Sequence, residues 1–480
     1  MRYCILLVLF TLLPARADVP HWLYRITAVH GGRMLYVQAR IEHPRNRYFS
    51  VDDGAEPFLK NAQVYYNGQW HALRPHDNFW RIPAAAGSAA VIRYRYDVDE
   101  ACRRLDRMGM AQRHGAIFHV CPEIFLLRPC DDEPARLTFH VACPDRTRFV
   151  CGFRRIGTAT WTCRASDLPL GPDAAFGPLN VQTIRVGQSV ITLAHTGMPM
   201  PDHFLRTWIA HQSIEVSNYF DGLPVHHLLV LMLPVPGGTT EGHARGGSGS
   251  SVCICVGDQV RARELMEDTV YVHELVHVCT PALHRDWHWM EEGIATYLER
   301  MIPAQTGDLS PQDVWLGLLQ DLPRGLPGPN DGCLNRCEDE NRIYFGGALY
   351  WFLADVQIRA HSAGRHTLQD VMRGLHHGGA SITRIWDIHR VFALGERATG
   401  VDDLATLYKS MGNTAYRPNL RHLWKQLGVQ RHGEDVTLKP APLASVRQSL
   451  TPPPPPTGTS LMEVVSNWVF GVLGSLEASQ

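Results

Sequence analysis

Apolar and polar residues alternate in short runs between Trp22 and about Cys163. The runs are WLYRITAV, RMLYVQARI, AAVIRYRYDV and ARLTFHVAC, separated by clusters of Gly, Pro, Asn and Asp. A period of two puts alternate side chains on opposite faces of a strand, so each run predicts a strand with one buried face. Several such strands in succession predict an antiparallel β-sandwich. We assign residues 18–175 to this domain, where no cluster of candidate catalytic residues stands out.

The pattern changes after the passage LPLGPDAAFGPLN. Residues His203 to Phe220 have helical spacing, and HHLLVLMLPV (226–235) is a continuous apolar run that predicts a buried strand. Glycine-rich GGTTEGHARGGSGSS then leads into a second short apolar run, SVCICVG. From about Glu264 almost to Val429 the spacing is helical. We therefore expect an α+β protein of several domains, with a mostly helical catalytic domain at 176–380 and a further helical part at 381–436.

The C-terminal end of the chain has a different composition. Residues 437–459 include KPAPLASVRQSLTPPPPPTGTS, which predicts a proline-rich linker that does not pack. Residues 460–480 are apolar but contain Glu463 and Asn467, which makes them too polar and too short for a membrane span. We expect an amphipathic tail that docks on a partner or, weakly, on a membrane surface.

The N-terminus has the three parts of a secretory signal peptide. Arg2 precedes an apolar run of about ten residues, and the small-x-small sequence Ala15-Arg16-Ala17 follows. We predict that residues 1–17 are removed before Asp18, which implies a periplasmic or secreted protein. The apolar run is too short to cross a bilayer, so no transmembrane span is expected after cleavage.

Composition adds two expectations. A net charge of −1 over 480 residues gives no electrostatic basis for nucleic-acid binding. Removal of Cys4 leaves an odd number of the 12 cysteines, so at least one has no disulfide partner within the chain. Because export permits disulfides, we expect local bridges within the cluster Cys121, Cys130, Cys143, Cys151 and Cys163, whose pairing stays open. We also expect a loop disulfide that joins Cys333 to Cys337.

The stretch HELVHVCTPALHRDWHWMEEGIATYLER (273–300) carries the clearest candidate chemistry. Residues 271–280 contain no glycine or proline before Pro281, and a helix there places His273 and His277 on one face. Two imidazoles at this spacing can bind one zinc ion, whose bound water would lose its proton to Glu274. The motif therefore predicts a zinc hydrolase site that still needs a third protein ligand.

The candidates for the third ligand are His284, His288, Glu291 and Glu292. His284 is one position out of register with the HExxHxxGxxH pattern, and His288 fits no pattern of known spacing. On a second helix from Trp287 to Arg300, Glu292 shares a face with Trp289, Thr296 and Glu299, whereas Glu291 points about 100° away, to solvent or substrate. We therefore predict Glu292 as the ligand and Glu299 as a carboxylate that hydrogen-bonds a ligating histidine.

These residues resemble the gluzincin arrangement of thermolysin-like aminopeptidases, here HELVH followed by WMEEGIATY. The segment 342–375 is similar to the glycyl aminopeptidase family, predicted metalloproteases with a PDZ domain. The matching residues are Tyr344, Gly347, Ala348, Leu353-Ala354-Asp355, Arg359, Gly364-Arg365 and Leu368-Gln369-Asp370-Val371-Met372. The resemblance covers roughly residues 200–380.

The resemblance implies a thermolysin-like zincin domain, one zinc ion per chain and a peptide or protein substrate. It also implies that the Tyr344 hydroxyl stabilises the oxyanion, with Gly346 and Gly347 opening space at a helix start. The glycine-rich stretch stands where related enzymes have a substrate-binding strand. Its expected contacts come from Gly237, Gly238, Glu241, Gly246 and Gly247.

The sequence departs from that family in three respects. Only 14 residues separate His277 from Glu292, so the loop between the two helices is shorter than in better-known relatives. Glu241 is the only glutamate near the glycine-rich stretch that could grip a substrate amino group. No PDZ domain follows residue 380.

The sequence thus favours an exported zinc metallopeptidase of the aminopeptidase-like gluzincin type. The competing interpretation is an exported zinc-binding scaffold that keeps the zincin fold without turnover. Retention of Glu274 and of all three ligands favours the enzyme.

Overall fold

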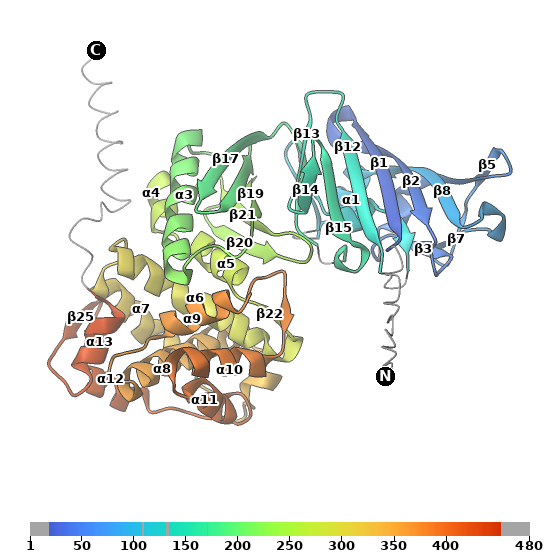
Figure 1. Cartoon of the computed structure of the whole chain (residues 1–480). Helices are drawn as coiled ribbons and strands as arrows, with labels where there is room; N and C mark the ends of the chain where they lie inside the picture. The colour runs from blue at the N-terminus through green and yellow to red at the C-terminus, as the bar shows by residue number, and fades with distance from the viewer. Residues whose placement is uncertain (1–18, 108–109, 131–133, 170, 453–480) are drawn as a thin grey trace, which may run out of the picture.

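The computed structural model describes residues 19–107, 110–130, 134–169 and 171–452. The predicted signal peptide and the predicted tail at 460–480 lie outside these residues. The chain forms an N-terminal β domain, a smaller sheet next to it and a helical region beyond that sheet (Figure 1). No helix among the described residues is long and apolar enough to cross a membrane.

An eight-stranded sheet forms one layer of the β domain. Its strands, in spatial order, are β14 (Arg154–Gly157), β15 (Thr160–Arg164), β12 (Arg136–Ala142), β1 (His21–Val29), β2 (Met34–Glu42), β8 (Ala89–Asp97), β4 (Leu59–Tyr66) and β5 (Gln69–Ala72). Neighbouring strands are antiparallel except β1 and β12, which run parallel. The predicted all-antiparallel arrangement is therefore wrong at this one pair.

Two four-stranded sheets lie against the large sheet. One contains β13 (Arg148–Cys151), β16 (Ala174–Gly177), β10 (Ile117–Val120) and β9 (Ala111–His114), and the other contains β11 (Arg128–Pro129), β3 (Tyr48–Ser50), β7 (Phe79–Arg81) and β6 (Pro75–His76). Helices α1 (Val98–Leu105) and α2 (Pro122–Phe125) complete the domain. In β1 the burial alternates residue by residue, and Trp22, Tyr24 and Ile26 share one core with Phe118 and Phe176 of the smaller sheet. The alternating sequence pattern therefore did identify the buried face.

A five-stranded mixed sheet links the β domain to the helices. Its order is β17 (Asn180–Val186), β18 (Ser189–His195), β19 (His227–Val235), β21 (Ser251–Gly257) and β20 (Thr240–Arg245). Leu229 and Leu231 of β19 pack on the β domain, whereas Leu228 and Val230 belong to the core with the helices. Burial on both faces explains why β19 is continuously apolar rather than alternating.

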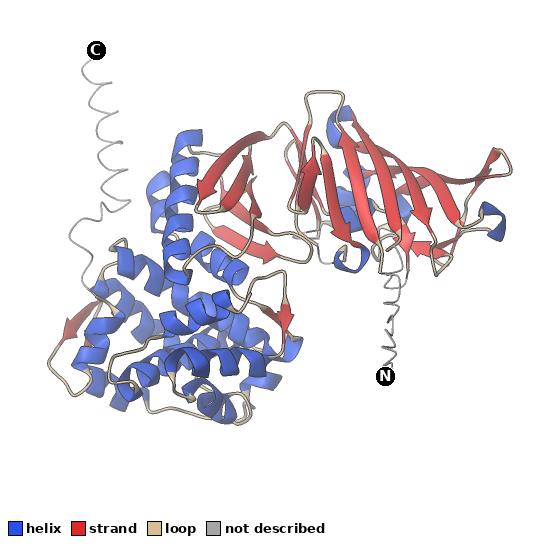
Figure 2. Ribbon diagram, in the orientation of Figure 1, coloured by secondary structure: helices blue, strands red, loops and turns tan. Residues whose placement is uncertain are grey.

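Helices form the rest of the chain, as the periodicity from Glu264 to Val429 predicts (Figure 2). They are α3 (Asp202–Phe220), α4 (Ala262–Glu267), α5 (Val270–Cys279), α6 (His288–Thr306), α7 (Pro311–Asp321), α8 (Gly347–His361), α9 (Leu368–His377), α10 (Ile388–Thr399), α11 (Asp403–Met411), α12 (Leu420–Leu427) and α13 (Ala444–Leu450). Two short sheets accompany them: β22 (Ala282–Leu283) pairs with β23 (Ile385–Trp386), and β24 (Val429–His432) pairs with β25 (Asp435–Leu438).

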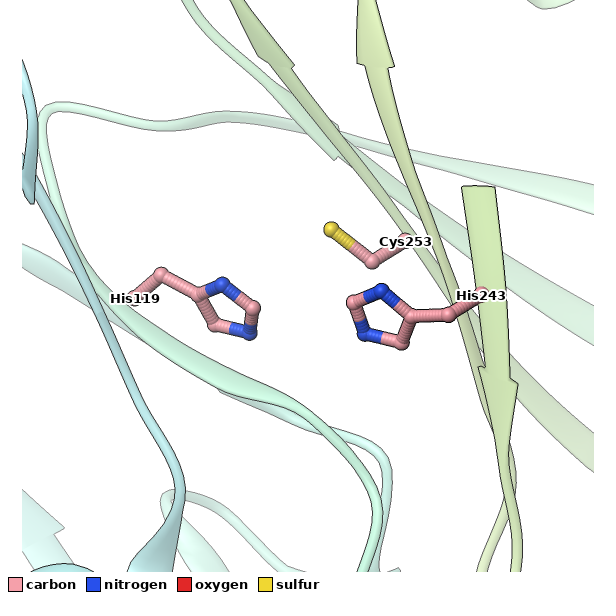
Figure 3. Close-up of side chains that lie close together, drawn as sticks. All are labelled: His119, His243 and Cys253. Atoms are coloured by element: carbon pink, nitrogen blue, oxygen red, sulfur yellow. The ribbon is translucent and has the colours of Figure 1, made fainter. Parts of the chain in front are cut away.

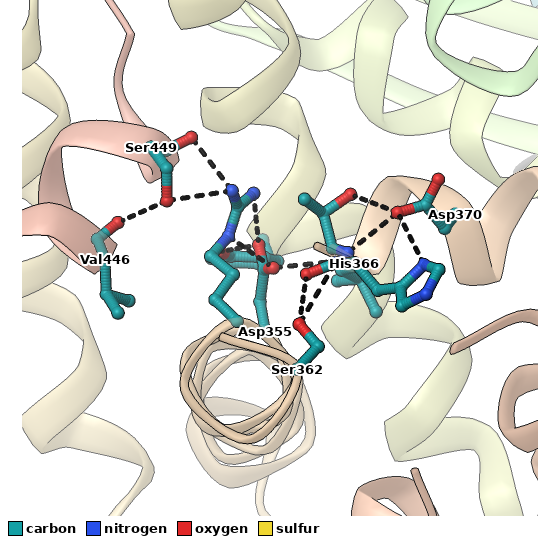
Figure 4. A network of polar contacts seen from close by, with 10 residues as sticks. Asp355, Ser362, His366, Asp370, Val446 and Ser449 are labelled. Carbon is teal, nitrogen blue, oxygen red and sulfur yellow. Dashed lines mark hydrogen bonds and ion pairs between the residues drawn. The ribbon is translucent and has the colours of Figure 1, made fainter. Parts of the chain in front are cut away.

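The segment that resembles the glycyl aminopeptidase family holds α8, α9 and α13 together (Figure 4). The buried Asp355 carboxylate accepts hydrogen bonds from the Arg359 side chain at 2.8 Å and from the backbone N–H of Leu368 at 3.0 Å. Arg359 in turn donates to the carbonyl of Ser449 at 3.0 Å. These residues therefore maintain the scaffold of the helical region.

The predicted linker at 437–459 is wrong for its first part. Residues 444–450 form α13, whose Leu450 is fully buried. Arg447 donates to the carbonyls of Leu427 and Lys439 at 2.8 and 2.6 Å, which ties the helix to the preceding hairpin. The proline-rich composition gave no indication of these contacts of Arg447 and Leu450. Residues 453–459 lie outside the described part of the chain.

Candidate active site

Two helices carry the predicted zinc ligands. α5 covers residues 270–279 and ends before Pro281, whose ring cannot continue a helix. α6 begins at His288, after a short connecting segment whose strand β22 pairs with β23. The Glu291 carboxylate accepts a hydrogen bond from the backbone N–H of Leu283 at 2.8 Å and so fixes the connecting segment. Glu291 therefore anchors the short loop, and the expectation that it faces solvent or substrate is wrong.

The structure brings His273, His277 and Glu292 together. The two Nε2 atoms are 3.2 Å apart, and they lie 3.3 and 3.5 Å from Oε2 of Glu292. Zinc–ligand bonds of about 2.0–2.2 Å at tetrahedral angles set ligand atoms roughly 3.3 Å apart. Two imidazoles and one carboxylate at this spacing fit a zinc ion, and they are the donors of a catalytic zinc site with one open position.

Glu299 orients the first of these histidines. Glu299 lies two turns beyond Glu292 on α6, and its Oε2 is 2.8 Å from Nδ1 of His273. With Nδ1 bonded to a carboxylate, the Nε2 atom is left to face the metal position. The placement agrees with the role predicted for Glu299.

Glu274 lies under the edge strand β20. The side chain is buried, and a Cβ atom on Gly242 of β20 would come within 2.8 Å of its Cγ and 3.0 Å of its Oε1. Only glycine allows the strand to lie this close to the carboxylate. Burial raises the pKa of Glu274, and the two neighbouring imidazoles oppose that shift. A carboxylate with a raised pKa is better suited to accept a proton near neutral pH.

The ring of Tyr344 is stacked near that of His273. The two rings are 6.1 Å apart between centroids and inclined by 20°. Tyr344 belongs to a π-helical turn (Arg342–Gly346), a geometry that is frequent at functional sites, and its side chain is 37% exposed. Burial and the Glu292 carboxylate raise the pKa of Tyr344, so its hydroxyl keeps its proton and can donate a hydrogen bond.

A glycine pair sets the position of Tyr344. A Cβ on Gly347 would lie 2.0 Å from the carbonyl oxygen of Trp289, and one on Gly293 would lie 2.2 Å from the carbonyl carbon of Gly347. The two glycines thus allow α8 to contact α6 backbone to backbone, directly after Glu292. Gly347 therefore serves close packing and does not open space at the helix start.

Glu241 is not brought to the site. Gly242 faces Glu274, and alternation along β20 places Glu241 and His243 on the opposite face of the sheet. His243 accordingly bonds to Asp173 of the β domain at 3.0 Å. The predicted role of Glu241 in gripping a substrate amino group has no geometric support.

The predicted substrate-binding glycines are spread over the β20 hairpin. Gly237 lies in the turn, where its N–H donates to Asp258, and Gly238 is in open space beside it. A Cβ on Gly246 would lie 2.3 Å from the carbonyl oxygen of Ile382, and one on Gly247 would lie 3.3 Å from that of Asp167. The last two glycines therefore pack against other segments of the chain.

The remaining histidines of the motif are not in the ligand group. His284 is exposed, with Asp286 at 3.6 Å. His288 is half-exposed, and its Nε2 lies 3.6 Å from the second oxygen of Glu292. The sequence pattern correctly excluded both from the group of His273, His277 and Glu292.

The cysteines predicted to pair in the C-terminal half do not do so. Cys333 and Cys337 both carry free thiols, as do Cys143, Cys151 and Cys163 in the β domain. The expected disulfide between Cys333 and Cys337 is therefore absent.

Several solved structures are similar to this chain in fold. An aminopeptidase N family protein from Idiomarina loihiensis has a TM-score of 0.67 at 15% identity, with 85% of this chain and 78% of that chain covered. A mutant M1 zinc metallopeptidase from Deinococcus radiodurans bound to a Tyr-Ser-Ala substrate has a TM-score of 0.51 at 18% identity, covering 84% and 95%. A two-domain M1 zinc metallopeptidase bound to L-arginine has a TM-score of 0.53 at 18% identity, also covering 84% and 95%.

The chain therefore shares the fold of these solved structures. No protein-family model matches the sequence, and no curated protein is detectably similar to it. The resemblance to the glycyl aminopeptidase family is not reflected among these structural neighbours.

Proposed function

We propose that this chain is an exported zinc-dependent metallopeptidase. The observation that carries the proposal is the convergence of His273, His277 and Glu292 at zinc-ligand spacing, with Glu274 buried beside them. The fold shared with M1 zinc metallopeptidases supports it. Export rests on the signal-peptide pattern of residues 1–17.

Each residue has a defined part in peptide hydrolysis. A zinc ion bound by the three ligands would acidify a water molecule and polarise the scissile carbonyl. Glu274 would take the proton from that water and deliver it to the leaving amine. The Tyr344 hydroxyl would donate a hydrogen bond to the carbonyl oxygen as negative charge develops there. Glu299 would hold His273 in its ligating orientation.

We propose aminopeptidase activity as the narrower form of this function. The structural neighbours include an aminopeptidase N family protein and a relative bound to a tripeptide substrate. Because Glu241 lies on the far face of β20, recognition of a free amino terminus must depend on other groups. Peptides with free and with acetylated N-termini distinguish an aminopeptidase from an endopeptidase. An aminopeptidase cleaves only the free peptide, whereas an endopeptidase cleaves both.

The alternative is an exported zinc-binding scaffold without turnover. Its ligand geometry would be the same, so zinc content does not distinguish it from the enzyme. The two differ in peptide cleavage by the mature protein, tested with a broad peptide library before and after zinc removal. Cleavage that stops with a chelator and returns with zinc supports the enzyme, and absence of any cleavage by zinc-loaded protein favours the scaffold.

A further inference from the structure

A second group of metal-binding side chains lies between the β domain and the five-stranded sheet. His119 comes from β10, Asp173 immediately precedes β16, and His243 and Cys253 come from β20 and β21. His119, Asp173 and Cys253 are almost inaccessible to solvent. Figure 3 shows the two imidazole rings facing each other, with the sulfur of Cys253 directed toward the space between them.

The distances within this group are short. One ring nitrogen of each histidine and the sulfur of Cys253 all lie within 4.8 Å of one another. Oδ1 of Asp173 is 2.8 Å from Nε2 of His119 and 3.0 Å from Nε2 of His243. Its other oxygen accepts a hydrogen bond from Ser251 at 2.6 Å, which fixes the carboxylate between the rings.

We propose that His119, His243 and Cys253 bind a second metal ion, a structural zinc, and that the neighbouring Asp173 carboxylate contributes the second negative charge. Imidazole nitrogen, thiolate sulfur and carboxylate oxygen are the donors that zinc takes in proteins. One thiolate and one carboxylate balance the double positive charge, so the buried site as a whole is neutral. His119 and Cys253 are almost inaccessible to solvent, so a zinc ion here could not reach a substrate and would be structural rather than catalytic.

The position of the site suggests what it stabilises. His119 and Asp173 belong to the β domain, whereas His243 and Cys253 belong to the sheet that borders the active site. His243 is adjacent in sequence to Gly242, which lies against Glu274. A metal ion here would join the two domains and fix the edge strand β20 beside the predicted general base.

Cobalt substitution separates this site from the active site, because only the second site contains a sulfur ligand. Wild-type protein loaded with Co²⁺ should show a near-ultraviolet thiolate-to-cobalt charge-transfer band. The band should persist in the double variant His273→Ala/His277→Ala and disappear in Cys253→Ser. Zinc analysis should give about two ions per chain in wild type and about one in each of these variants. His119→Asn provides a second test at a different ligand.

The outcomes for the two sites are independent. A double active-site variant that retains no zinc, together with wild-type cobalt protein that lacks the thiolate band, would overturn the second site and leave the proposed peptidase intact. His119, Asp173 and His243 would then form a metal-free hydrogen-bond network. A band that survives in Cys253→Ser would assign the thiolate to another cysteine and equally overturn the proposed ligand set. Failure of peptide cleavage would bear only on the proposed function, because these readouts do not depend on activity.

Discussion

Replacing Gly242 by alanine should disable Glu274 without removing the metal ligands. The added methyl carbon would lie 2.8 Å from Cγ of Glu274, 3.0 Å from its Oε1 and 3.1 Å from Cδ1 of Ile254. Ordinary carbon contacts are about 3.5–4.0 Å, so the neighbours must move by several tenths of an ångström or more. Pairing with β21 holds β20 in place, so we expect the Glu274 side chain to move.

The expected loss follows from the displacement of the general base. Misplacing a catalytic group by about 1 Å costs on the order of 100-fold in rate, which corresponds to about 2.7 kcal/mol in activation free energy. The three atoms nearest to the added methyl carbon belong to Glu274 and Ile254, not to the ligands His273, His277 and Glu292, so zinc content should stay at the wild-type value. We therefore expect kcat to fall roughly 100-fold with little change in KM.

The assay is steady-state peptide hydrolysis with parallel zinc analysis and thermal unfolding. Gly157→Ala is the matched control, because Gly157 also lies in a strand and a Cβ there would meet only Thr160, at 3.8 Å. The control should retain wild-type kcat, zinc content and Tm. Full activity in Gly242→Ala would refute the close packing of β20 on Glu274. Loss of zinc in that variant would show that the strand acts through the ligands instead.

Two further predictions concern the surroundings of the site, and a third concerns the ion-paired His211 of α3. Tyr344→Phe should lower kcat roughly 10²–10³-fold through loss of one oxyanion donor, with KM and zinc content unchanged in the same assay. Glu299→Gln should weaken zinc binding about 10–100-fold, measured by competition with a chelator, because the Nδ1 atom of His273 loses its charged partner. The third prediction concerns pH: two carboxylates outweigh the burial of His211 and raise its pKa to about 9 from the ordinary 6.5. The folded state then binds the extra proton, so its contribution to stability is complete below about pH 6.5 and disappears as the pH rises through about 9. Chemical denaturation across that range should show this decline in wild type and a smaller decline in His211→Asn, and a decline of unchanged size in the variant would contradict the assignment.

The grouping of His273, His277 and Glu292 could be predicted because helix geometry fixes which residues share a face. His273 and His277 are separated by one turn, and Glu292 and Glu299 by two turns, so each pair projects in one direction. Termination by Pro281 limited the first helix, and the apolar face of the second showed how it would pack. These local rules were sufficient for the metal site and for the partner of His273.

The role of the glycine-rich strand could not be predicted in the same way. EGHAR contains no alternation of apolar and polar residues, so nothing in the sequence indicates whether Glu241 or Gly242 faces the active site. The register with β21 decides it, and that pairing depends on residues outside the strand. The same limitation explains why Glu291 was misplaced, since its partner Leu283 is fixed by the pairing of β22 with β23.

The group of His119, Asp173, His243 and Cys253 at the domain interface could not be predicted from the sequence, for a different reason. His119, Asp173 and His243 are far apart in the sequence and match no metal-binding spacing. Only the packing of the β domain on the five-stranded sheet brings them together. A histidine in a strand otherwise made of small and charged residues, such as His243, was the one available signal.

The central claim is that Glu274 activates a water molecule at a zinc ion held by His273, His277 and Glu292. Its most direct test compares mature wild-type protein with Glu274→Gln, in which a group of the same size cannot accept the proton. We predict equal zinc content in the two proteins and peptide turnover that is roughly 10²–10⁴-fold lower in the variant. Equal turnover in the two zinc-loaded proteins would contradict the claim.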